Sequence, residues 1–94
     1  MKTKVNSSPD TIKNEIRSCL EGKSIYEMTV WTRDHAQHLK WFCNYKSSKI
    51  DSRIQPVMSF SYFLYENFKD DPIAIEELRE ICVNCVIDLD TNCR

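Results

Sequence analysis

Residues 24–46 constrain this chain most, because they contain neither glycine nor proline and have the pattern of one long helix. Ser24 and Glu27 form the S-x-x-E pattern of a capping box, in which the two residues satisfy free amides of the first turn. Apolar and aromatic side chains then recur every three or four residues, which predicts one buried face of Met28, Trp31, His35, Leu39 and Phe42. We therefore expect a long helix that is the central element of the fold, a dimer seam, or both.

The segment before this helix predicts a shorter one. Ser8, Pro9 and Asp10 are typical of a helix start, with serine as the N-cap and proline in the first turn. Gly22 is typical of a helix end, because glycine adopts the left-handed conformation that closes many helices. Only a short link then remains before the long helix.

Two further helices are expected in the second half of the chain. Residues 47–55 break the apolar periodicity, and we predict a loop there. Pro56 suits the first turn of a third helix, and Asp71 followed by Pro72 suits the start of a fourth. The expected core face of the third helix consists of Val57, Phe60, Phe63, Leu64 and Phe68.

The fold class follows from these helices and from the scarcity of turn residues. One glycine and three prolines in 94 residues supply little material for tight hairpins, which argues against an all-β fold. No run of about 18 apolar residues is present to cross a membrane. We predict an all-α, compact four-helix domain over residues 1–94 with one long central helix, assembled as a homodimer because so small a core gains from association.

Five cysteines without a secretory signal indicate reduced thiols and an intracellular protein. The pair Cys82-x-x-Cys85 has the spacing of a zinc or redox motif, and His35-x-x-His38 offers further ligands. Both pairs lie inside periodic helices, however, where a three-residue step also places side chains on one buried face. Core thiols are the favoured interpretation, zinc and a redox pair are the alternatives, and we expect no bound metal.

Catalysis is not expected from this sequence. Gly22 is the only glycine, so the chain lacks a phosphate-cradling loop and a glycine-rich nucleophile elbow. Cys43 near the two histidines has no oxyanion hole that we can identify. We therefore predict no enzyme activity, no cofactor and no small-molecule substrate.

The charges are distributed unevenly along the chain. Residues 1–55 contain ten Lys or Arg against six Asp or Glu, whereas residues 56–94 contain three against eight. Cations spaced along a helix and the following loop can meet successive phosphates, and aromatic rings among them can stack on terminal or unpaired bases. An ordinary solvated face with core aromatics would give the same pattern. Trp41 and Tyr45 lie among these cations in the sequence. The candidate RNA-binding residues are Arg33, His38, Lys40, Lys46, Lys49 and Arg53.

Parts of the chain resemble the amino-terminal domain of the RNA-silencing suppressor of tenuiviruses, the rice stripe and rice hoja blanca group. The similarity spans roughly residues 17–85, and the segment between Tyr62 and Cys82 is longer here. It is carried by Leu20-x-Gly22, Arg53-Ile54, Met58-Ser59-Phe60-Ser61-Tyr62 and Cys82-x-x-Cys85.

This resemblance implies a viral suppressor of RNA silencing in the host cytoplasm. It implies a helical domain that dimerises and sequesters small double-stranded RNA without base specificity, and a chain that is a piece of a longer protein. The alternative class is a helical protein-interaction module, with the acidic helix over residues 73–89 as its docking surface.

Overall fold

The computed structural model describes residues 9–94 and shows an all-α, four-helix fold, as predicted. The helices are α1 (Pro9–Leu20), α2 (Ile25–Phe42), α3 (Ser47–Phe68) and α4 (Pro72–Asn92). The expected N-cap Ser8 lies outside the described residues. The domain is flattened, with extents of 46 × 33 × 16 Å.

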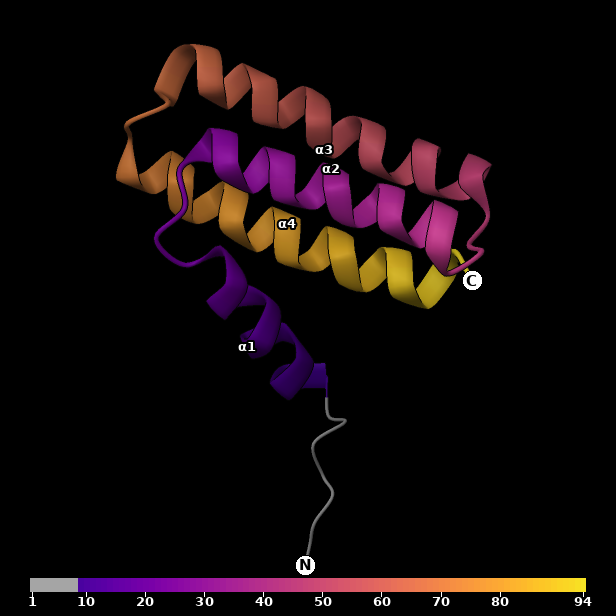
Figure 1. Ribbon diagram of the computed structural model, residues 1–94. Helices are drawn as coiled ribbons and strands as arrows, with labels where there is room; N and C mark the ends of the chain where they lie inside the picture. Colours follow the sequence, from indigo (N-terminus) through magenta and orange to yellow (C-terminus); the bar gives the residue numbers. More distant parts are fainter. Residues whose placement is uncertain (1–8) are drawn as a thin grey trace, which may run out of the picture.

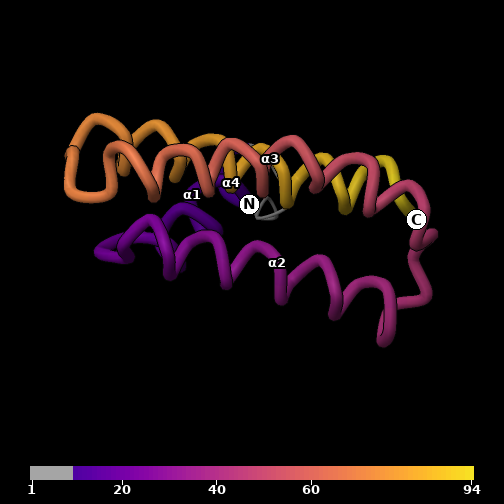
Figure 2. The backbone as a smooth tube through the Cα atoms, turned by 90° about the horizontal axis from the view of Figure 1, so that it is seen from above, coloured from indigo at the N-terminus to yellow at the C-terminus, as the bar shows by residue number. Residues whose placement is uncertain are grey.

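The three long helices α2, α3 and α4 form a bundle in which each packs against the other two (Figures 1 and 2). The α3 helix runs antiparallel to α2 and α4, while the shorter α1 diverges from the bundle and packs on α4. The α4 helix packs against each of the other three helices. It is therefore the central element, rather than the helix expected over residues 24–46.

The starts of α2 and α4 and the end of α1 follow the sequence closely. The Ser24 hydroxyl accepts a hydrogen bond from the Glu27 amide at 3.1 Å, and the Glu27 carboxylate accepts one from the Ser24 amide at 2.9 Å, which confirms the capping box. Asp71 caps α4 by accepting a hydrogen bond from the Ile73 amide at 2.9 Å. Gly22 follows α1 with a φ of 78°.

The prediction of a loop over residues 47–55 is wrong, because these residues form the first turns of α3. Ile50 is fully buried there and Ile54 packs against the core, so they continue the inward face that Val57 and Leu64 complete. Pro56 therefore lies inside the helix rather than in its first turn. Pro56 leaves the carbonyl of Ser52, an exposed residue, without its helical donor.

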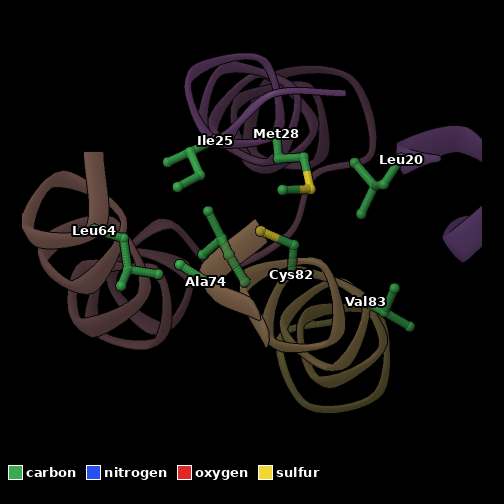
Figure 3. Packing of buried hydrophobic residues seen from close by; sticks show 8 residues of the cluster. Leu20, Ile25, Met28, Leu64, Ala74, Cys82 and Val83 are labelled. Atoms are coloured by element: carbon green, nitrogen blue, oxygen red, sulfur yellow. The ribbon is translucent and has the colours of Figure 1, made fainter. Parts of the chain in front are cut away.

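The core lies between α2, α3 and α4, and Leu20 at the end of α1 closes one side of it (Figure 3). Figure 3 shows Met28, Leu64 and Cys82 meeting there from three different helices. The prediction that Phe63 and Phe68 lie in the core is wrong, because both rings are exposed. The small Ser61 occupies the buried face of α3 instead, and its hydroxyl has no hydrogen-bond partner among residues 9–94.

Candidate nucleic-acid interface

The helix expected over residues 24–46 ends at Phe42, four residues earlier than expected. The turn that follows it is held in place by backbone hydrogen bonds. Asn44 adopts a left-handed conformation with a φ of 60°, which asparagine tolerates better than most residues. The Tyr45 amide donates a hydrogen bond to the Leu39 carbonyl at 3.1 Å, and the Lys46 amide donates one to the Cys93 carbonyl at 3.0 Å. The turn is therefore attached to α2 and to the end of α4.

Tyr45 strengthens this attachment through its side chain. Its hydroxyl donates a hydrogen bond to the Asp90 carboxylate at 2.6 Å, which raises the pKa of the tyrosine. The same hydrogen bond lowers the pKa of Asp90, and Arg94 supports that shift from 3.1 Å. Both groups consequently keep their hydrogen-bonding states at neutral pH, the phenol as donor and the carboxylate as acceptor. The Tyr45 side chain therefore stabilises the fold and is not available to stack on a base.

Two large aromatic side chains project from the last turn of α2. Trp41 is 71% exposed and Phe42 is 75% exposed. The His38 ring lies 5.2 Å from the Phe42 ring, centroid to centroid. Phe42 was expected in the buried stripe, and that expectation is wrong because Leu39 is the last residue of α2 in the core. We call Trp41, Phe42, Lys46 and Lys49 the α2–α3 corner.

Two of the six predicted RNA-binding residues already have carboxylate partners on neighbouring helices. The Lys40 ammonium lies 2.9 Å from Asp51, and its side chain is only 19% exposed. The Arg53 guanidinium donates hydrogen bonds of 2.9 and 2.8 Å to the two carboxylate oxygens of Asp88. These hydrogen bonds raise the pKa of Arg53. An incoming phosphate would have to compete with both carboxylates.

The other four predicted residues divide into two groups. Arg33 lies further back on α2, with its Nε 4.0 Å from the neighbouring Asp34 carboxylate. His38 contacts the corner through Phe42. Within residues 9–94, no carboxylate forms an ion pair with Lys46 or Lys49, and both side chains are exposed. The His38 ring thus contacts one of the exposed rings, and Lys46 and Lys49 follow these rings along the chain across the α2–α3 turn. Lys40 and Arg53 are instead paired with carboxylates.

The cysteines of the second half of the chain lie in the core, as the favoured interpretation predicted. Cys82, Cys85 and Cys93 are buried free thiols, whereas Cys19 and Cys43 are exposed. Burial raises the pKa of Cys82, and it raises the pKa of Cys85 to about 12. In the part of the chain that the structure describes, no group of three or more His, Cys, Asp or Glu side chains is arranged to hold a metal ion.

This burial predicts two classes of thiol reactivity. Iodoacetamide at about pH 8 should modify Cys19 and Cys43 in the folded protein and reach the three buried thiols only after denaturation, because the thiolate is the reacting species. Mass spectrometry of the intact protein should therefore find two added groups before denaturation and five after it. Rapid addition of a third group without denaturation would show that α4 is less well packed than described.

A narrow cleft opens where α1 diverges from α2 and α4. It has a volume of about 390 Å³ and is lined mainly by apolar side chains, including Ile12, Ile16 and Leu39. His35 lies in its wall, stacked on Trp31 at 5.5 Å, and burial lowers the pKa of this histidine. Since none of the lysines and arginines within residues 9–94 lines the cleft, it does not extend the cationic surface of the α2–α3 corner.

The outer side of α3 carries a second exposed aromatic surface, which we call the aromatic face of α3. Two of its rings, Phe63 and Phe68, lie 6.0 Å apart, and a third, Tyr65, lies 6.0 Å from Tyr26 on α2. Sequence periodicity missed this face because these residues fit the buried side of a helix equally well. The face consists of Tyr62, Phe63, Tyr65 and Phe68.

Comparisons with models of protein families, with curated proteins and with solved structures found no match to this chain. No helix within residues 9–94 is long and apolar enough to span a membrane.

Proposed function

We propose that this protein binds small double-stranded RNA without base specificity and sequesters it, as a viral suppressor of RNA silencing in the host cytoplasm. The observation that carries the proposal is that the α2–α3 turn follows the exposed rings of Trp41 and Phe42 and leads to two exposed lysines, Lys46 and Lys49, that form no ion pair within residues 9–94. Lysine ammonium groups bind phosphates as point charges, and exposed aromatic rings stack on bases of any identity. No catalytic step is part of this proposal.

The absence of base specificity follows from the geometry of RNA. The major groove of an A-form duplex is deep and narrow, so side chains reach the phosphates and the 2′-hydroxyl groups rather than the base edges. Lys46 and Lys49 are three residues apart at the start of α3, about 4 to 5 Å along its axis. Two cations so close together contact neighbouring phosphates, and a homodimer would present two such pairs.

Replacing Lys46 and Lys49 together by alanine is expected to weaken duplex RNA binding by roughly tenfold for each lost phosphate contact at about 0.1 M salt. The salt dependence should become flatter by about two units of slope. Two unrelated duplex sequences should lose affinity equally, because the contacts are to the backbone. Gel shifts with duplex RNA, duplex DNA and single strands measure these quantities.

Two variants serve as controls for this measurement. Lys69→Ala removes an exposed lysine beyond the opposite end of α3, where it lies over the Tyr65 ring, and should leave binding unchanged. Arg53→Ala should have a smaller effect than the lysine variants, because Asp88 already neutralises Arg53. If the double lysine variant keeps both its affinity and its salt slope, the α2–α3 corner does not bind RNA and the proposal fails.

A protein-interaction module is the second candidate, and the outer side of α4 favours it. Ile73 is 74% exposed there, beside the exposed carboxylates of Glu76 and Glu77. The surface that a partner could contact is only part of the helix expected over residues 73–89. The inward side of this helix forms the core, and Glu80 is paired with Arg17. A basic amphipathic peptide that binds the wild type and not an Ile73→Lys variant would support this candidate.

A further inference from the structure

The α2–α3 corner combines two lysines with two largely exposed aromatic rings, Trp41 and Phe42. This composition limits the ways in which the corner could bind RNA. A protein that binds along the flank of a duplex uses a row of cations that meets many phosphates. Here such a row would have to run through Arg33, Lys40 and Arg53, which face Asp34, Asp51 and Asp88 respectively. Each of these carboxylates would also repel the RNA backbone. Flank binding is therefore poorly supported by this surface.

The position of the rings fits a different part of the duplex. Trp41 and Phe42 are in the last turn of α2, and the turn that follows leads directly into the first residues of α3. This turn lies at one end of the three-helix bundle, beside the end of α4 (Figure 1). Rings that project near the end of a bundle can meet a flat target without collision between the helices and the duplex.

The flat target that a duplex offers is its terminal base pair, whose outer face has no stacking neighbour. We propose that Trp41 and Phe42 stack on the end of duplex RNA while Lys46 and Lys49 hold the phosphates nearest that end. This inference rests on the proposed function and specifies its ligand as a duplex RNA terminus. Aromatic stacking is worth about 5- to 150-fold in affinity for each stacked base, a range that includes the roughly tenfold effect expected for one phosphate contact.

A comparison of open and closed duplexes tests this inference. One ligand is a duplex RNA with two free ends, and the other contains the same stem with both ends closed by non-nucleotide linkers. The wild-type protein should bind the open duplex at least about fivefold more tightly. Trp41→Ala should remove this preference while retaining the weaker binding of the closed stem, which depends on Lys46 and Lys49.

Two controls make the result specific. Tyr26→Ala removes an exposed ring from the opposite end of α2 and should keep the preference for open ends. A fluorescent base analogue should change its emission on binding when it occupies the terminal position of the duplex, and not when it occupies the centre. Both readouts report stacking rather than general affinity.

The outcomes separate this inference from the function on which it rests. Equal binding of open and closed duplexes, both weakened by the double lysine variant, would overturn end stacking and leave RNA binding intact. Binding of neither duplex would overturn the proposed function, and the inference with it. A preference for open ends that survives Trp41→Ala would place the end contact on another surface and overturn the assignment to the corner.

Discussion

Replacing Leu78 by alanine is expected to lower the free energy of unfolding by about 2–5 kcal/mol. Leu78 is fully buried on α4, the helix that packs against all three others. The loss combines the transfer free energy of the removed atoms with a cavity that helices on several sides cannot collapse to fill. Since a domain of this kind has a total stability of roughly 5–15 kcal/mol, the variant should be close to unfolding.

Thermal and urea denaturation followed by circular dichroism measure this effect. The melting temperature should fall by at least about 8 °C. Ile73→Ala is the matched control, because it makes a similar change on the exposed side of the same helix and should alter stability by about 0.5 kcal/mol or less. Equal effects of the two substitutions would mean that α4 is not the centre of the core.

The number of helices and most of their starts could be predicted because those features are local. The capping box of Ser24 and Glu27 and the cap at Asp71 involve residues two or three positions apart. Gly22 likewise ends its helix through its own backbone conformation. Signals of this kind act within one turn, so a sequence contains them in full.

The start of α3 was missed because polar composition concealed a regular core pattern. Residues 47–55 contain mostly serine and charged side chains, which resemble a loop. Ile50 and Ile54 nevertheless continue the spacing of Val57 and Leu64 towards the core. A helix needs only a narrow apolar stripe when a single layer of neighbours covers it, and tertiary packing then overrides local composition.

The pairing of Arg53 could not be predicted from the sequence, because its carboxylate partner lies far along the chain. Arg53 and Asp88 are 35 residues apart, and Arg17 and Glu80 are 63 residues apart. Both pairs join the basic first half of the chain to the acidic second half. Part of the charge asymmetry thus serves contacts between helices, and only the helix arrangement shows which lysines remain available to a ligand.

A Phe63→Glu substitution is expected to convert the protein from a dimer into a monomer. Four large rings of α3 are exposed, and large exposed apolar side chains that gather on one element often mark a protein contact. A second copy of α3 would cover these rings, and two-fold symmetry would place the same rings on both sides of the contact. A buried carboxylate without a partner would prevent that contact. Because Phe63 is 53% exposed in the single chain, the variant should still fold.

Light scattering after size-exclusion chromatography measures the mass directly. The wild type should elute at twice the chain mass of 11.1 kDa, and Phe63→Glu at the chain mass. Gln55→Glu adds the same charge to an exposed position of α3 away from these rings, and it should remain dimeric. Unchanged circular dichroism in both variants would show that the monomer is folded. A wild-type protein that stays monomeric at high micromolar concentration would contradict the expectation. Each molecule would then offer RNA a single α2–α3 corner, whose two lysines, Lys46 and Lys49, form no ion pair among the described residues.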